Sequence, residues 1–91
     1  MPHSPDDKKR AITRLRRIRG QAEALEQAIG AGADCGAVLQ QLAAIRGAVN
    51  GLMAKVLEGH LQESLGDPAA DTHVRETALR DVATLVRSYL R

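Results

Sequence analysis

The chain has 91 residues, of which 44% are hydrophobic, and Tyr89 is its single aromatic residue. One domain of this length lies near the lower limit for a self-sufficient core. The lone cysteine excludes an intramolecular disulfide framework and favours a reducing, cytoplasmic environment. No apolar run approaches the roughly 20 residues that cross a membrane, and the N-terminal residues lack the apolar stretch of a secretory signal. These features indicate a small cytoplasmic protein with no membrane association.

Residues 5–29 are predicted to form the first helix. Ser4 is the expected N-cap, Pro5 the first helical residue, and Asp7 the acidic residue of a capping box. Apolar residues then recur every three or four positions until the sequence Gly30-Ala31-Gly32 interrupts the pattern. This seam consists of Ala11, Leu15, Ile18, Ala22, Leu25 and Ile29.

Residues 34–64 are predicted to form a longer helix, with Asp34 as its cap. Its large apolar residues alternate at spacings of four and three: Val38, Leu42, Ile45, Val49, Leu52 and Val56. The short glycine-containing link predicts that the two helices form an antiparallel hairpin. Gly47 and Gly51 each cost about 1 kcal/mol inside a helix, so we expect another helix to pass close to them.

Gly66-Asp67-Pro68 ends the second helix, and residues 72–90 are predicted to form a third. Its expected apolar face is Leu79, Val82, Val86 and Tyr89. No strand pattern or repeat occurs, so the predicted fold is a single all-α domain over residues 1–91. Long amphipathic helices in so short a chain usually complete their core by oligomerising. We therefore expect a dimer with a four-helix-bundle core, and leave open whether two dimers join.

Basic residues are concentrated near the N-terminus, where seven of the 13 lie within the first 19 positions. Arg10, Arg14 and Arg17 fall within about 60° on one side of the first helix. Arginine binds phosphate oxygens in bidentate fashion, and Arg46 on the second helix is a candidate to join this surface. A solvated helix face is the alternative interpretation. Acidic neighbours are few, so the stripe favours double-stranded DNA as the partner.

Cys35 and His60 lie near opposite ends of the second helix. At 100° per residue they share one side within about 20°, but about 37 Å of helix separates them. A cysteine at a helix N-terminus is favoured as thiolate, although a lone cysteine is more often a small buried hydrophobe. The two side chains can cooperate only if a second chain packs antiparallel to the first.

The N-terminus offers a further reactive group. Removal of Met1 would expose Pro2 as a secondary amine, followed by His3. An antiparallel dimer would bring Cys35 of one chain to Pro2, His3 and His60 of the other. This set could bind Zn, Co or Ni, or a small carbonyl compound could bridge it covalently.

An enzyme and a structural scaffold are the other functional classes. One thiol and two distant histidines provide no acid–base pair within a protomer, so the sequence indicates that the protein is not an enzyme. A scaffold would not account for the basic residues crowded at the start of the chain.

Two motifs closely resemble the CsoR/RcnR family of all-helical bacterial repressors. They are RLRRIRGQ at Arg14–Gln21 and LQQLAAIRGAVNGLM at Leu39–Met53, accompanied by Cys35 and His60. The resemblance covers essentially the whole chain. It implies three-helix protomers that form dimers and disc-shaped tetramers, bind operator DNA without inducer, and release it on sensing one.

The sensing positions resemble the formaldehyde-responsive, FrmR-like subtype. Ser64 stands where copper sensors carry a second cysteine and nickel/cobalt sensors a histidine, whereas Met1–Lys9 matches the opening MPxxPxxKK of the formaldehyde sensors. The resemblance implies that formaldehyde bridges Pro2 and Cys35 of neighbouring subunits, with His3, His60 and Ser64 supporting the pocket and no cofactor required. It assigns DNA binding to Arg10, Arg14, Arg17 and Arg46. The alternative within the family is a Zn, Co or Ni site of Cys35, His60 and His3.

Overall fold

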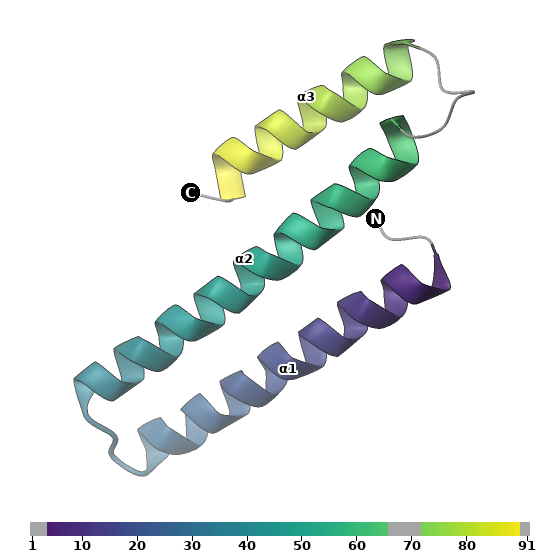
Figure 1. Ribbon diagram of the computed structural model, residues 1–91. Helices are drawn as coiled ribbons and strands as arrows, with labels where there is room; N and C mark the ends of the chain where they lie inside the picture. The colour runs from purple at the N-terminus through teal and green to yellow at the C-terminus, as the bar shows by residue number, and fades with distance from the viewer. Residues whose placement is uncertain (1–3, 66–71, 90–91) are drawn as a thin grey trace.

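The computed structural model describes residues 4–65 and 72–89, with the backbone alone for residues 64 and 65. Its elements are α1 (Pro5–Gly30), α2 (Cys35–Leu65) and α3 (Thr72–Tyr89). α1 and α2 form an antiparallel hairpin, and α3 runs back along α2 on the side away from α1 (Figure 1). The all-α fold class and the three-helix protomer are confirmed. Each helix end lies within one residue of its predicted position.

Local capping interactions determine these ends. The backbone N–H of Asp7 donates to Ser4 Oγ at 3.0 Å at the start of α1. α1 ends in a Schellman motif, in which the N–H groups of Ala33 and Gly32 donate to the carbonyls of Ala28 and Ile29. Gly32 adopts φ +82°, the left-handed conformation that glycine reaches without a Cβ clash. The turn back into α2 therefore depends on this glycine.

Asp34 caps α2, because its Oδ1 accepts a hydrogen bond from the Ala37 N–H at 2.7 Å. Replacing Asp34 with alanine is expected to lower the free energy of unfolding by about 1 kcal/mol. Urea denaturation at one fixed protein concentration would measure the loss, since association shifts apparent stability. Asp34→Asn keeps the acceptor and should stay within a few tenths of a kcal/mol of the parent. Equal stability of Asp34→Ala and the parent would show that the cap contributes nothing.

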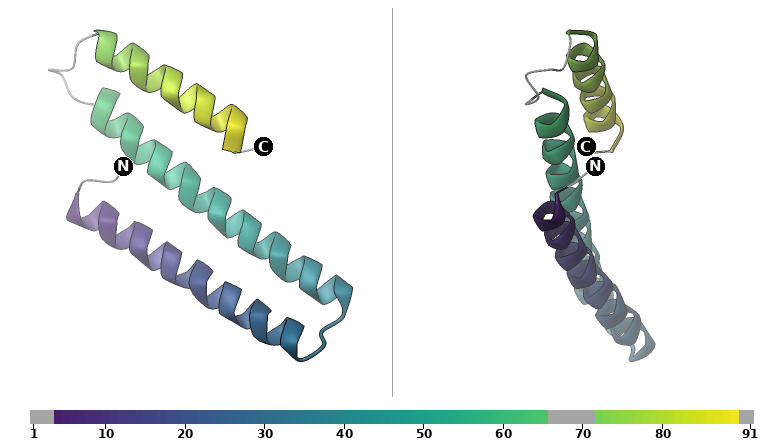
Figure 2. Two further views of the ribbon diagram at one scale, coloured as in Figure 1. Left: turned by 180° about the vertical axis from the view of Figure 1, so that it is seen from behind. Right: turned by 90° about the vertical axis from the view of Figure 1, so that its right-hand side faces the viewer.

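The three helices lie side by side in one layer. The molecule measures 56 × 28 × 12 Å, and an edge-on view shows no second layer (Figure 2). The short dimension is about the width of one helix. Among the residues that the structure describes, only Leu25 and Ala78 are buried, with 7% and 3% of their surface exposed. A layer this thin covers little apolar surface on either flat side.

The apolar seams predicted for α1 and α2 are only partly buried. Ile18 is half-buried and Leu25 is buried, whereas Leu15 and Ile29 are 56% and 57% exposed. On α2, Leu42 remains 47% exposed. One neighbouring helix covers only part of a wide apolar stripe. The remainder is left for another surface.

The face of α3 that packs on α2 differs from the predicted apolar face. Ala78 is buried, and Val82 and Leu85 are half-buried at helical spacing from it. Leu79 and Tyr89 are 55% and 62% exposed. The apolar periodicity identifies the large apolar side chains of α3. It does not show that the small Ala78 lies at the centre of the contact with α2.

The expectation that a helix passes close to Gly47 and Gly51 is wrong for the described part of this chain. A Cβ at Gly47 would meet nothing within 4 Å, and one at Gly51 would meet only Nη1 of Arg14, at 3.6 Å. The close neighbour is thus an arginine side chain. None of the helices described combines the length and apolarity that a membrane span requires.

Candidate functional site

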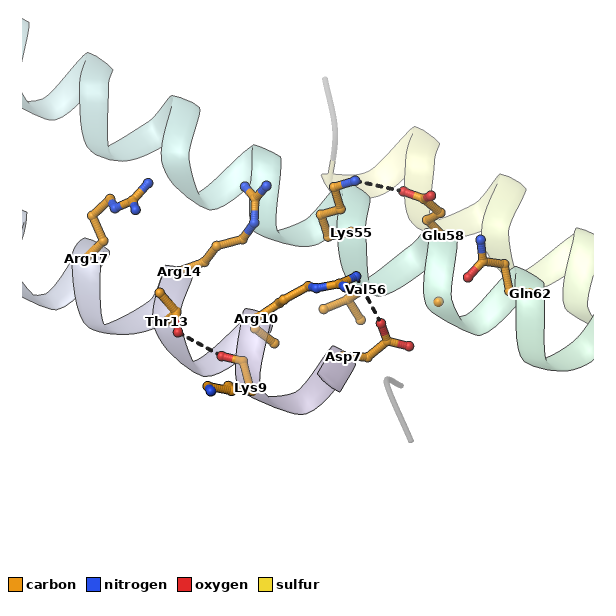
Figure 3. A pocket seen from close by; sticks show the side chains of 12 residues that line it. Asp7, Lys9, Arg10, Thr13, Arg14, Arg17, Lys55, Val56, Glu58 and Gln62 are labelled. Carbon is orange, nitrogen blue, oxygen red and sulfur yellow. Dashed lines mark hydrogen bonds and ion pairs between the residues drawn. The ribbon is translucent and has the colours of Figure 1, made fainter. Parts of the chain in front are cut away.

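A charged groove of about 530 Å³ lies between the N-terminal half of α1 and the C-terminal half of α2 (Figure 3). Five of its lining side chains are basic and two are acidic. These charged residues are Asp7, Lys9, Arg10, Arg14, Arg17, Lys55 and Glu58. The excess of positive charge makes the groove suited to an anionic partner.

Both acidic residues of the groove stand beside a basic one. A carboxylate oxygen of Asp7 lies 3.9 Å from Arg10 Nη1, and Glu58 Oε2 lies 3.3 Å from Lys55 Nζ. Such solvent-exposed pairs contribute little stability. Arg14 and Arg17 form no ion pair with any residue of the described ranges. Their guanidinium groups therefore remain available to phosphate oxygens.

Arg14 reaches across the hairpin. Its Nη1 lies 3.6 Å from the position that a Cβ of Gly51 would occupy, so the guanidinium rests over the surface of α2. Figure 3 shows Arg14 and Arg17 extending from α1 toward α2, with Lys55 following Arg14 along the groove. Lys55 lies four residues after Gly51, on the same side of α2. Cations from two helices thus share one surface.

The sequence-predicted DNA-binding residues divide into two locations. Arg10, Arg14 and Arg17 line the groove. Arg46 is exposed but does not line it, and at 100° per residue it points about 180° away from Lys55 around α2. Lys55 is the α2 cation that sequence reasoning missed. The signal that could have found it is its spacing of one turn from Gly51, on the side of α2 opposite the apolar seam.

The candidate sensing residues lie far apart within the chain. Cys35 is the first residue of α2, and its thiol is free and exposed. His60 is half-buried near the other end of α2, in a mostly apolar groove of about 420 Å³ beside Asp81 and Leu85 of α3. The helical rise separates the two by about 37 Å. The structure does not bring Cys35 and His60 together within one protomer.

The remaining sensor candidates have no described side chain. Pro2 and His3 lie outside the described residues, and Ser64 belongs to α2 with its backbone alone. α1 begins at the end of the hairpin opposite Cys35 (Figure 1), and its 26 residues span about 39 Å. Within residues 4–65 and 72–89, no three His, Cys, Asp or Glu side chains gather to hold a metal ion. Any site that joins Cys35 to His60 or to residues next to the start of α1 must therefore combine different chains.

Comparison with known proteins decides the family. The family model described as metal-sensitive transcriptional repressor matches residues 7–88. The chain belongs to this family of repressors. Members regulate transcription rather than catalyse reactions, which supports the inference that the protein is not an enzyme.

Individual relatives narrow the position within the family. Over its full length the chain is 42% identical to the whole of the transcriptional repressor RcnR of Citrobacter koseri, and 53% identical to an uncharacterised protein of Serratia marcescens encoded in the bioA 5′ region. A solved structure of a variant of the formaldehyde-responsive regulator FrmR from Salmonella enterica serovar Typhimurium is 50% identical. It superposes with a TM-score of 0.84, with 97% of this chain and 99% of that one covered. The resemblance to the CsoR/RcnR family and to its FrmR-like members is confirmed.

Proposed function

We propose that this repressor senses formaldehyde, and that it releases operator DNA when formaldehyde joins Pro2 of one subunit to Cys35 of another. The observation that carries the proposal is the free, exposed thiol of Cys35 at the hairpin end remote from the start of α1. The similarity to a formaldehyde-responsive regulator supports the choice of inducer. Release of the operator would derepress genes for formaldehyde detoxification.

The reaction requires only the N-terminal amine of Pro2, the thiol of Cys35 and formaldehyde. The Pro2 nitrogen attacks the carbonyl carbon, and the carbinolamine that forms loses water to give an iminium ion. The Cys35 thiolate then attacks the iminium carbon and forms an N–CH₂–S bridge. One formaldehyde enters and one water leaves, so each bridge adds the mass of one carbon atom. His3, His60 and Ser64 are proposed to support this pocket.

The bridge requires an antiparallel assembly of subunits. The unpaired apolar surface supports such an assembly, since Leu15, Leu39 and Leu42 are each about half exposed and large exposed apolar patches mark interaction sites. Packing two hairpins through these residues would form a four-helix-bundle dimer. A dimer of dimers would then repeat the charged groove several times along one DNA duplex.

The covalent bridge acts on DNA affinity through the conformational equilibrium of the assembly. An inducer shifts such an equilibrium only by its differential affinity for the two states. The covalent tether can form in only one of the two arrangements of the subunits, so it stabilises that arrangement over the other. We propose that, in the tethered arrangement, the distances between the charged grooves no longer match the spacing of the DNA phosphates.

Intact-mass spectrometry and denaturing electrophoresis after low-dose formaldehyde test the proposal. The expected product is a pair of cross-linked chains, each lacking Met1, with one added carbon per bridge and with the modification mapping to Pro2 and Cys35. Pro2→Ser should give no such product and should keep its DNA affinity in formaldehyde. Loss of DNA binding by treated Pro2→Ser would refute the N-terminal amine mechanism.

Sensing of Zn, Co or Ni is the second candidate function, favoured by the metal-sensitive family to which the chain belongs. Its proposed ligands are Cys35, His60 and His3, again from different chains. His60→Ala should then abolish metal-induced DNA release while Pro2→Ser largely keeps it. DNA-binding titrations with each ion and with formaldehyde compare the two candidates. Release of DNA by formaldehyde and by none of the three ions would exclude the metal candidate.

A further inference from the structure

We propose that α2 contributes its own DNA-phosphate contact through Lys55, and that Glu58 competes with DNA for this lysine. The inference rests on the proposed use of the charged groove as the DNA-binding surface. It extends that surface from the arginines of α1 to a second helix.

The first step is the position of Lys55 relative to Arg14. Arg14 Nη1 lies over Gly51, and Lys55 follows Gly51 by one helical turn on the same side of α2. Both side chains line the same groove. A phosphodiester backbone that contacts Arg14 there therefore passes beside the Lys55 ammonium.

The second step is the present partner of Lys55. Its Nζ lies 3.3 Å from Glu58 Oε2, and the two side chains are 58% and 56% exposed. An ion pair in so much water contributes little free energy and exchanges partners readily. A phosphate oxygen can replace the carboxylate without burying any charge. Glu58 then acts as an internal competitor that lowers the affinity for the anion.

The third step is the accessibility of the groove in an assembled repressor. Around α1, Leu15 lies about 140–160° from Arg10 and Arg17. Around α2, Leu42 lies about 140° from Lys55. Leu15 and Leu42 thus point well away from Arg10, Arg17 and Lys55, whereas Arg14 lies about 100° from Leu15. A second chain that covers the apolar side leaves the groove open to DNA.

An acidic protein segment is the other anion that such a groove could hold. DNA is favoured because the chain belongs to a family of transcriptional repressors, and because closely spaced phosphates can contact Arg14 and Lys55 together. The salt dependence of DNA binding separates specific phosphate contact from a merely solvated lysine.

The test is fluorescence-anisotropy titration of operator DNA with the full-length repressor at several salt concentrations. Lys55→Ala is expected to weaken binding roughly tenfold at ~0.15 M salt and to lower the salt slope by about one for each Lys55 in contact. Lys55→Arg should restore both quantities. Glu58→Gln should tighten binding about two- to fivefold, which is the range for an exposed ion pair.

Arg80→Ala on α3 is the matched control, because Arg80 is exposed and lines neither groove. Its affinity and salt slope should equal those of the parent. If Lys55→Ala leaves both unchanged while Arg14→Ala lowers them, the Lys55 contact is refuted and the arginine surface stands. If both variants bind as the parent does, the groove is not the DNA-binding surface. Weaker binding by Glu58→Gln would refute the competition.

Discussion

Cys35→Ser is expected to bind operator DNA with the affinity of the parent and to lose release by formaldehyde entirely. A serine hydroxyl is a far weaker nucleophile than a thiolate at neutral pH, so the iminium on Pro2 of the neighbouring chain stays untrapped. Cys35 is exposed at the first position of α2, and the α2 cap comes from the Asp34 carboxylate. The substitution therefore leaves the helix and its start unchanged.

The measurement is operator affinity with and without formaldehyde, alongside electrophoresis under denaturing conditions. Asp34→Asn provides a control next to the thiol, since it keeps the cap and Cys35 and should respond as the parent does. If Cys35→Ser still cross-links and still releases DNA, the thiol takes no part in sensing. Cross-linking of the parent without DNA release would instead show that the bridge does not control DNA binding.

Arg14→Ala is expected to weaken operator binding between tenfold and a hundredfold at ~0.15 M salt, because a hydrogen bond to a charged group contributes about 1.5–3 kcal/mol. Arg14 is exposed, forms no ion pair within the described residues, and lies over Gly51 in the groove. Its loss should remove the proposed phosphate contact without disturbing buried packing. The salt slope should fall by about one for each Arg14 in contact.

Arg19→Ala is the matched control for this measurement. Arg19 is also an exposed arginine of α1, but it lies about 140° from Arg14 around the helix and outside the groove. Binding of Arg19→Ala should stay close to that of the parent. Equal losses in both variants would indicate that overall charge, rather than the groove, determines the affinity.

The helices and their ends could be predicted from the sequence because local interactions set them. Ser4 and Asp34 each accept a hydrogen bond from an N–H three residues later, and Gly32 supplies the left-handed turn that ends α1. The two long motifs likewise indicated the repressor family, which the comparisons confirm. Helix length alone separated Cys35 from His60, because each residue adds about 1.5 Å.

Only the tertiary structure decided which side of each helix is covered. Periodicity grouped Leu15 with Leu25, but the packing of α2 buries Leu25 and leaves Leu15 exposed. The same packing laid Arg14 over Gly51 and added Lys55 to the arginine groove. These contacts join residues far apart in the sequence, and they depend on how two helices rotate against each other. A helical pattern determines what lies on one side of its own helix, whereas the neighbour determines which side becomes the interior.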